Sequence, residues 1–421
     1  MKLLNSILIL GSFIYFLNAQ SPFSLEEENT FEGGLGITWI DGQSFTTFTL
    51  SPDISFGNVG VGLNIELLFN NSGGFEFRKT GWDKGAGILR AIRYIRYGYK
   101  YDPVYARIGT LDAATLGHGF LLWYYSNGSN YDQRKIGLAF DLDFDKFGFE
   151  TVTSNLLNVE IYGGRLYYRP LFSSEIPVIK NLELGATLIS DRDPDNINDT
   201  DDAVTAWGLD IGLPVIQQKF FTTTIYYDFA KISEFGSGNV VGVDFGFPDL
   251  IGILSLSTKL EKRFLGDKFL PNYFGPLYEL ERKVYVPETG LDKRSALTTT
   301  GSSEGIFGQL AGNFAGKIKL IGSFQKLNGI GHSGIMHLEA RMPELIPSMI
   351  FRATYDKTNI DSFDDVTTLD VFSLASVEIG YKTYNFLILS MLYRWYFIEV
   401  EPNIFKPQER IEPRISVSFA F

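Results

Sequence analysis

The chain of 421 residues contains no cysteine and only three histidines, and these absences exclude several kinds of site. Without a thiol there is no disulfide, no lipidated N-terminal cysteine and no cysteine-ligated metal. The sequence also has no His-Glu-x-x-His helix and no Walker loop, which mark metalloproteases and nucleotide-binding proteins. None of the histidines, His118, His332 and His337, lies beside a recognisable catalytic partner. We therefore expect no catalytic residues, no enzyme activity and no obligatory cofactor.

Long apolar runs and excess positive charge are absent too. No segment after the first 19 residues has 18 continuous apolar residues, so no membrane-spanning helix is expected. The formal net charge is −12, whereas a nucleic-acid-binding protein needs a basic face. In contrast, 36 Phe, 22 Tyr and 43 Gly are present, with only five Met. Aromatics, glycine and short alternating runs are typical of a membrane β-barrel with aromatic girdles at both interfaces.

The C-terminal residues 411–421 alternate strictly in polarity. Ile415, Val417 and Phe419 share one face with the terminal Phe421, while Arg414, Ser416 and Ser418 occupy the other. A period of two predicts a strand with one apolar and one polar face. A last strand of this kind, ending on Phe, is how outer-membrane β-barrels end, and Phe419 and Phe421 are the expected assembly signal.

The N-terminal segment Met1–Ala19 has the form of a secretory signal peptide. Lys2 supplies the positive start, residues 3–17 are mostly apolar, and Ala19 is a small residue suited to cleavage before Gln20. We therefore expect export through a cleaved signal peptide and a single domain over residues 20–421. A single domain is expected because no linker and no break in composition interrupts residues 20–421.

Between the two ends, the pattern predicts an all-β fold. Twenty candidate strands can be marked, and 16 to 20 is the expected range for a transmembrane antiparallel up-and-down barrel. Successive connections alternate between short turns and long loops, which places short turns on the periplasmic side. The expected long loops are 70–87, 112–133, 191–202, 264–305, 358–369 and 398–410. A soluble β-sandwich or propeller would also alternate, but its turns would be short on both sides.

A stretch near residue 100 resembles one seen in bacterial outer-membrane barrels. It contains Arg96-Tyr97-Gly98, then residues 102–109 (Asp-Pro-Val-Tyr-Ala-Arg-Ile-Gly), and later Leu116-Gly117-His118-Gly119. As a whole the chain resembles an outer-membrane porin or channel. The resemblance implies contact with outer-membrane lipid and lipopolysaccharide, the barrel assembly machinery and small solutes. Porins often form homo-oligomers, but one chain reveals no subunit interface.

Alternation also assigns charged residues to the lumen. We expect a constriction with Arg96 and Arg107 on the basic side, Asp141, Asp143 and Asp210 on the acidic side, and Tyr105 nearby. Charges of opposite sign across a wet lumen create a transverse field that filters small solutes. The alternative is that these charges only solvate or cross-link the inner wall.

Residues 111–127 form a loop that is unusually apolar between residues 120 and 125. Such a loop should not remain in water, so we expect it to fold into the barrel and narrow the pore. The inward candidates are His118, Phe120, Trp123 and Tyr124. The alternative is a contact with a subunit or another partner at the rim.

The loop 191–202 carries carboxylates with the spacing of a calcium loop. Asp191, Asp193, Asp195, Asp199 and Asp202 fall at positions 1, 3, 5, 9 and 12. Position 6 is Asn196 rather than Gly, position 12 is not Glu, and the expected flanking elements are strands. A structural Ca²⁺ is one hypothesis, and a solvated acidic loop is the other.

Taken together, these patterns predict a passive outer-membrane channel for small hydrophilic solutes or ions, filtered by a charged constriction. Two other functions stay open. A gated transporter for a specific hydrophobic or sugar ligand would use the apolar run as a binding groove. A structural or adhesive surface protein would have a sealed barrel and working loops.

Overall fold

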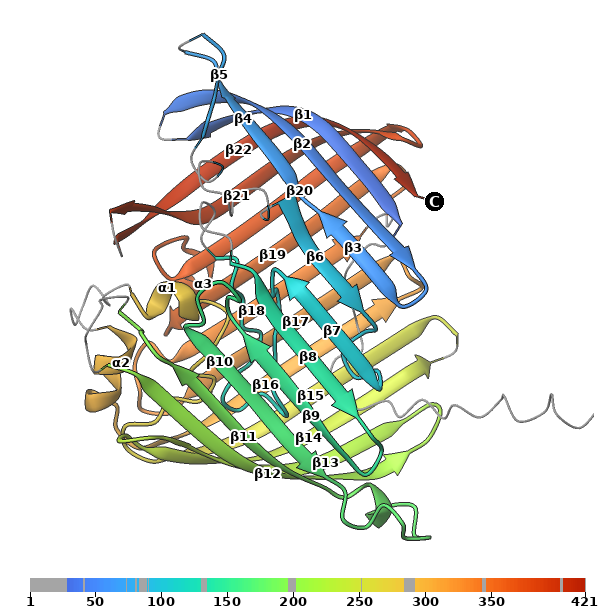
Figure 1. Cartoon of the computed structure of the whole chain (residues 1–421), viewed down its shortest axis with the longest axis vertical. Coiled ribbons are helices and arrows are strands. Elements are labelled where there is room, and N and C mark those ends of the chain that lie inside the picture. The colour runs from blue at the N-terminus through green and yellow to red at the C-terminus, as the bar shows by residue number, and fades with distance from the viewer. Residues whose placement is uncertain are drawn as a thin grey trace, which may run out of the picture.

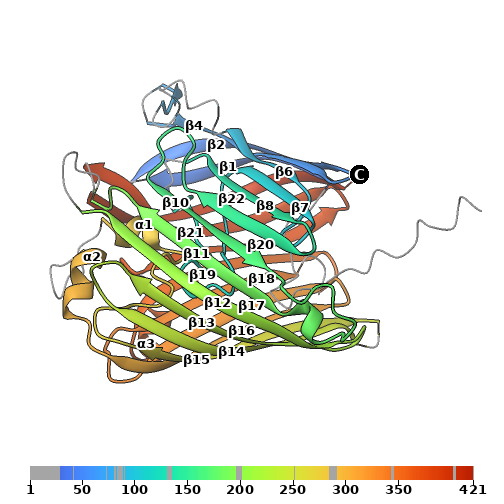
Figure 2. The same cartoon turned by 60° about the horizontal axis from the view of Figure 1, so that its bottom comes forward.

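The computed structural model describes residues 29–420, except for residues 41, 73, 80–81, 83–88, 90, 130–134, 196–201, 251, 284–291, 343–345 and 402–403. The expected signal peptide and Phe421 lie outside the described residues. Strands dominate the described part, and Figures 1 and 2 show them running around a single barrel.

The strands follow one another around the barrel in chain order. They are β1 (Thr30–Ile40), β2 (Gln43–Phe56), β3 (Val59–Leu63), β4 (Ile65–Asn70), β5 (Glu76–Phe77), β6 (Ile92–Tyr97), β7 (Val104–Gly109), β8 (Gly137–Asp143), β9 (Phe147–Thr153), β10 (Ile161–Tyr168), β11 (Glu183–Asp191), β12 (Val204–Gln217), β13 (Thr222–Ile232), β14 (Ser237–Leu250), β15 (Leu254–Leu265), β16 (Ser303–Phe314), β17 (Ile318–Leu327), β18 (Gly334–Met342), β19 (Met349–Ile360), β20 (Ser373–Tyr384), β21 (Leu387–Glu401) and β22 (Ile404–Ala420).

In the connections that the structure describes lie three short α-helices, namely α1 (Tyr278–Glu281), α2 (Lys293–Ala296) and α3 (Phe363–Thr367). Single 3₁₀ turns occupy Ile179–Asn181 and Leu297–Thr299. Among the described residues, no helix has the length and apolar character needed to span a membrane.

The sheet closes on itself because the first and last strands pair. β1 pairs antiparallel with β22, from Thr30 opposite Ala420 to Gly36 opposite Arg414. β3 and β4 are two halves of one strand interrupted at Asn64, and β5 is a two-residue addition to β4. The barrel therefore has 20 strands, which confirms the expected fold class. Phe419 pairs with Phe31 in this closing ladder.

One predicted loop is wrong. Residues 398–410 were expected to form a long loop, but β21 continues to Glu401 and β22 begins at Ile404. This hairpin is rich in charge and contains Pro402 and Pro407, so it lacks the apolar alternation by which the strands were recognised. The backbone ladder still forms there, with Phe397 opposite Pro407 and Ile398 opposite Lys406.

The barrel has an apolar outer face. In β16, Ile306 and Leu310 are 58% and 52% exposed, whereas Phe307 and Gln309 between them are buried. Exposed aromatics gather beside the short turns, including Phe56 at the β2–β3 turn and Phe144 and Phe147 at the β8–β9 turn. An apolar outer band with aromatic girdles is the surface that a lipid bilayer solvates.

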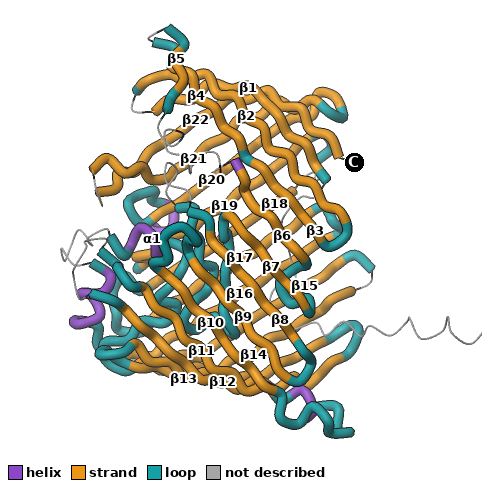
Figure 3. The backbone as a smooth tube through the Cα atoms, in the orientation of Figure 1, coloured by secondary structure: helices purple, strands orange, loops and turns teal. Residues whose placement is uncertain are grey.

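The main apolar core lies inside the barrel instead of between two sheets. Its members come from the β7–β8 connection, from the β15–β16 connection and from inward-facing positions of β8 to β17. Figure 3 shows loop segments lying within the barrel as well as at its two ends. The lumen is thus partly filled by chain from its own loops.

If the exposed face meets lipid, a charge in the middle of it should weaken the barrel. Leu209 lies in the middle of β12 and is 53% exposed, so we expect Leu209→Arg to cost about 2–4 kcal/mol of stability in a bilayer. Denaturant unfolding in phospholipid vesicles measures this. Phe363→Arg is the matched control, because Phe363 is 78% exposed on α3 in a loop. Equal stability of both variants would contradict a lipid-facing β12.

Candidate functional site: the lumen and its inward segment

The lumen wall places carboxylates directly opposite one another on neighbouring strands. Asp141 on β8 faces Glu150 on β9, and Asp210 on β12 faces Asp228 on β13. Like charges at directly opposite positions destabilise a sheet unless a counter-charge reaches both. This part of the wall therefore needs cations.

Arginines occupy equivalent positions elsewhere on the wall. Three directly opposed pairs are Arg96 with Arg107, Arg341 with Arg352, and Arg394 with Arg410. They lie on β6–β7, β18–β19 and β21–β22, whereas the acid pairs lie on β8–β9 and β12–β13. The two signs of charge are thus concentrated on different parts of the inner wall.

Each acid pair is held by cations from nearby chain. Lys100 Nζ lies 2.8 Å from Asp141 and 3.1 Å from Glu150, so one ammonium bridges the first pair. Arg165 forms two hydrogen bonds to Asp210, of 2.9 and 2.5 Å, and also contacts Glu150. The imidazole Nδ1 of His118 lies 2.7 Å from Asp228.

Neighbouring carboxylates balance the arginine pairs. Glu66 contacts Arg410 and lies 3.7 Å from Arg394, so it lies between the members of one pair. Arg352 contacts Glu32 at 2.6 Å and Glu378 at 3.1 Å. The carboxylates therefore fix the guanidinium groups in position, and Arg410 is fully buried among them.

Residues 111–127, which we call the inward segment, fold as a narrow loop inside the barrel. Leu111 and Asn127 hydrogen-bond to each other at its base. Above the base, Ala114 and Tyr125 exchange two backbone hydrogen bonds of 2.9 Å. The apolar residues of the run, including Phe120 and Leu122, are buried. Burial of this run inside the lumen agrees with the expectation that it should avoid water.

The inward segment contacts strands on several sides of the barrel. His118 pairs with Asp228 on β13, and its ring stacks on Tyr226 with centroids 4.0 Å apart. Trp123 Nε1 donates to Gln309 on β16 over 3.3 Å, and Tyr124 packs against His337 on β18. Burial alone would lower the pKa of His118, but the adjacent Asp228 carboxylate reverses this and raises it.

A second segment, residues 269–282, packs against the inward segment. Leu122 and Phe274 form a parallel β-bridge, and Tyr125 donates a hydrogen bond to Glu279 on α1. This helical segment is fastened to the wall by Arg282, which is 2% exposed and contacts Glu160 and Asp191. Lys135 adds contacts of 2.8 Å to Glu160 and Glu279. We call this group of ion pairs, formed by Lys135, Glu160, Asp191, Glu279 and Arg282, the rim lock.

The two segments leave a large cavity on one side of the lumen. This main cavity has a volume of about 770 Å³ and is lined by Arg96, Arg107, Asp141, Tyr105, Trp123 and Tyr124 among others. A neighbouring cavity of about 310 Å³ shares Arg93, Arg341 and Arg394 with it. Basic and acidic side chains line both cavities.

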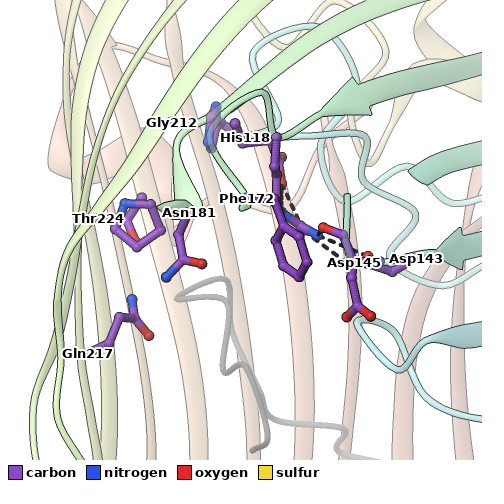
Figure 4. Close-up of a pocket in the computed structure, with 11 residues that line it drawn as sticks. His118, Asp143, Asp145, Phe172, Asn181, Gly212, Gln217 and Thr224 are labelled. Carbon is purple, nitrogen blue, oxygen red and sulfur yellow. Dashed lines mark hydrogen bonds and ion pairs between the residues drawn. The ribbon is translucent and has the colours of Figure 1, made fainter. Parts of the chain in front are cut away.

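A smaller acidic space lies near His118. Two cavities of about 80 and 70 Å³ share His118, Asp143, Arg169, Glu183 and Thr224, and we call them together the acidic chamber. Figure 4 shows residues that line the first of them, with His118 beside Gly212, Thr224 near Asn181, and Asp143 next to Asp145.

The structure brings together some of the predicted constriction residues and separates others. Arg96, Arg107, Tyr105 and Asp141 line the main cavity. Asp143 instead lines the acidic chamber, and both oxygens of Asp210 are bound by Arg165. Arg165 and Arg282 could not be singled out from the sequence, because the local pattern is the same for an arginine that contacts several distant carboxylates and for one that is only solvated at the wall.

The predicted calcium loop is only partly assembled. Asp193, Asp195 and Asp202 place one oxygen each within 4.8 Å of one another. Asp191 does not join them, because it is fully buried at the end of β11 and binds Arg282 and Tyr278. Asp199 lies outside the described residues. Calcium binding by this loop stays a prediction.

Residues 301–305 match the spacing Gly-x-Ser-x-Gly of a hydrolase elbow. That motif works at a strand-to-helix turn that exposes the serine. Ser303 instead begins strand β16, in a ladder where it pairs with Leu265. The match is therefore a feature of spacing and not of catalytic geometry.

No protein-family model matches the chain, and no curated protein matches it. Among solved structures it is similar to OccK10 (OpdN) of Pseudomonas aeruginosa, with 12% identity over 93% of this chain and 98% of that one, and a TM-score of 0.34. The outer membrane protein OpdK of the same organism gives 10% identity, 93% and 98% coverage, and a TM-score of 0.33. The ferric enterobactin receptor PfeA is 8% identical over 94% of this chain and 82% of that one, with a TM-score of 0.37.

The rim lock should respond to pH. Burial would raise the pKa of Glu279, but Arg282 and Lys135 outweigh it and lower the pKa from 4.5 to about 2. A carboxyl group whose pKa is lower in the folded than in the unfolded state stabilises the fold at pH values above its unfolded pKa. This contribution is lost as the pH falls through the folded pKa. We expect the thermal midpoint to fall between pH 4.5 and pH 2, as measured by circular dichroism in detergent micelles.

The variant Glu279→Gln should have a lower midpoint at pH 7 and a weaker pH dependence in this range. Glu304→Gln is the control, since Glu304 is 57% exposed and pairs with Lys262. If Glu279→Gln follows the wild-type curve, the rim lock does not stabilise the fold in the way described.

Proposed function

We propose that the protein is an outer-membrane channel for passive passage of small hydrophilic solutes. The observation that carries the proposal is the main cavity of about 770 Å³, which lies inside a barrel with an apolar outer face. A barrel of twenty strands is wide enough to enclose a lumen, and the inward segment and residues 269–282 fill only part of it. The remaining space is lined by charged and aromatic side chains that water can solvate.

Filtering would come from size and from the transverse field. Arg96, Arg107 and Arg341 line the main cavity, and so do Asp141 and Glu339. In a wet lumen, rings of fixed charge select solutes by charge and dipole at little cost in desolvation. The inward segment supplies one side of the narrow part through Trp123 and Tyr124.

The same proposal includes the surroundings of the barrel. The apolar belt would contact outer-membrane lipid, and the charged loops would meet lipopolysaccharide. The terminal strand with Phe419 and Phe421 would be read by the barrel assembly machinery, after removal of residues 1–19. Association with further copies of the chain is compatible with the apolar belt. The proposed channel has no catalytic role.

A second candidate function is a transporter for sugars. The observation that favours it is a group of aromatic side chains on the main cavity, formed by Tyr99, Tyr101, Tyr105, Trp123 and Tyr124. Aromatic faces stack on the apolar faces of sugar rings, while neighbouring charged groups can bind hydroxyls. In that case neutral oligosaccharides should block the ion current in a concentration-dependent way, whereas an unselective channel would conduct unchanged.

Charge selectivity tests the channel directly. In a planar bilayer under a salt gradient, we expect stable conductance steps with a non-zero reversal potential. Glu339 and Arg341 lie on the same face of β18 and both line the main cavity. Arg341→Gln should shift the reversal potential towards cation selectivity, and Glu339→Gln should shift it the other way. The exposed Glu304→Gln serves as control and should leave it unchanged.

A folded barrel that carries no current would contradict passive passage and favour a gated transporter or a surface-structural protein. Folding is checked independently by heat-modifiable electrophoretic mobility.

Shortening the inward segment tests its part in the narrowing. Replacing residues 113–124 with Gly-Gly-Ser keeps the hydrogen bonds between Leu111 and Asn127 but removes Trp123 and Tyr124 from the cavity. We expect a larger single-channel conductance, because the open cross-section grows. An unchanged conductance in a correctly folded barrel would place the limiting constriction elsewhere.

A further inference from the structure

The acidic chamber has more negative than positive charge around it. Nine carboxylates line it or lie directly behind it, namely Asp102, Asp141, Asp143, Asp145, Glu150, Glu183, Asp210, Asp228 and Asp244. The permanent cations that contact these groups are Lys100, Arg165 and Arg169, and His118 adds a further positive charge when it is protonated. Because the chamber lies within the barrel, such an excess is costly unless something balances it.

The cations are already shared between carboxylates. Lys100 contacts Asp141 and Glu150, and Arg169 contacts Asp143 and Glu183 at 2.9 Å each. Arg165 contacts three acids, Glu150, Glu183 and Asp210. His118 is engaged by Asp228. None of these contacts reaches Asp244.

Asp244 forms no direct ion pair among the described residues, although Lys259 and His118 lie near enough to attract its carboxylate. It is 1% exposed on β14, it lines the acidic chamber, and its Oδ1 has no hydrogen-bond partner among the described residues. Lys259 lies opposite it on β15, but the ammonium donates over 2.6 Å to the backbone carbonyl of His118. Across the chamber, Asp141 Oδ1 likewise lacks a partner within the described chain, since Lys100 binds the other oxygen.

We propose that the acidic chamber binds a hydrated divalent cation of the calcium type, with Asp244 as a ligand. Carboxylate oxygens are the donors that such hard cations prefer, and these ions commonly retain water ligands. The two cavities of 80 and 70 Å³ are large enough for an ion with several waters, since one water needs roughly 10–15 Å³ of such volume. A bulkier organic cation would fill these spaces poorly.

This site is distinct from the surface loop with Asp193, Asp195 and Asp202, and it does not depend on whether the barrel conducts. It adjoins the inward segment, because the backbone N–H of Gly117 donates to Glu150 over 3.0 Å and His118 lines the chamber. A cation there would screen the repulsion between Asp210 and Asp228 and between Asp141 and Glu150. Bound cation would therefore hold the inward segment against this wall.

The test uses the full-length barrel in detergent micelles, stripped with EDTA and titrated with Tb³⁺. Tyr101 and Tyr167 line the chamber, so their excitation should sensitise terbium luminescence, and added Ca²⁺ should displace the ion. We expect Asp244→Asn to weaken binding at this site by at least about tenfold, as loss of groups around a metal generally does. The double variant Asp193→Asn/Asp195→Asn is the matched control, because it removes two acids from the surface loop alone; it should retain the signal.

Thermal unfolding gives a second readout. Ca²⁺ should raise the thermal midpoint of the wild type, since a ligand that binds only the folded state stabilises it, and the rise should be small in Asp244→Asn. In EDTA the variant should be at least as stable as the wild type, because a buried carboxylate without a direct ion pair is gone. If Asp244→Asn fails the heat-modifiability test of folding, Asp141→Asn replaces it with the same expectations.

Two results would overturn the proposal. Loss of the terbium signal in the surface-loop variant, with an unchanged signal in Asp244→Asn, would place the cation outside the chamber. An equal stability gain of Asp244→Asn in EDTA and in Ca²⁺, without any calcium effect on the wild type, would mean that a proton neutralises Asp244.

Discussion

The constraint on which the rest of the structure depends is that a strand in lipid has no water for its backbone. Every N–H and C=O in the bilayer must pair with a neighbouring strand, so the sheet has to close, and the ladder between β1 and β22 closes it. Closure fixes which side chains face lipid and which face the lumen, because successive residues alternate. The polar half of every strand is thereby enclosed, and its charges must find partners inside.

The lumen shows how those partners are found. Opposed arginines and opposed carboxylates lie on different strands, and each pair is held by groups that come from turns, neighbouring strands or loops. Lys100 follows β6 in a turn, His118 comes from the inward segment, and Arg282 comes from the end of α1. The loops inside the barrel therefore supply both counter-charges and apolar side chains that fill part of the lumen. The main cavity is the space that they leave on one side.

The fold could be predicted from sequence because its signals are local. Alternation in β12 or β22, short turns such as Gly57-Asn58 and the aromatic residues beside them each report on a few adjacent residues. The apolar character of residues 120–125 was likewise enough to suggest burial. The ends of β21 and β22 were missed because their charged sequence has no apolar period.

Predicting the site was harder, because its pairings join residues far apart in the chain. Alternation predicts that Asp210 faces the lumen, but it does not indicate the pairing with Arg165, which lies 45 residues earlier. Asp191 fitted a calcium spacing, yet Arg282, 91 residues later, binds it. The spacing of carboxylates along the chain therefore predicts a set of metal ligands only where the folded backbone brings these carboxylates together.

The contacts of the inward segment also set an order of events during assembly. Trp123 binds Gln309, which is 186 residues further along the chain, and Tyr125 binds Glu279, 154 residues further along. Contacts between such distant residues form late, because a long stretch of chain must first be ordered. The segment can reach its final position only once β16 and β18 stand opposite it. The inward segment therefore reaches its final position only after these later parts of the chain are in place.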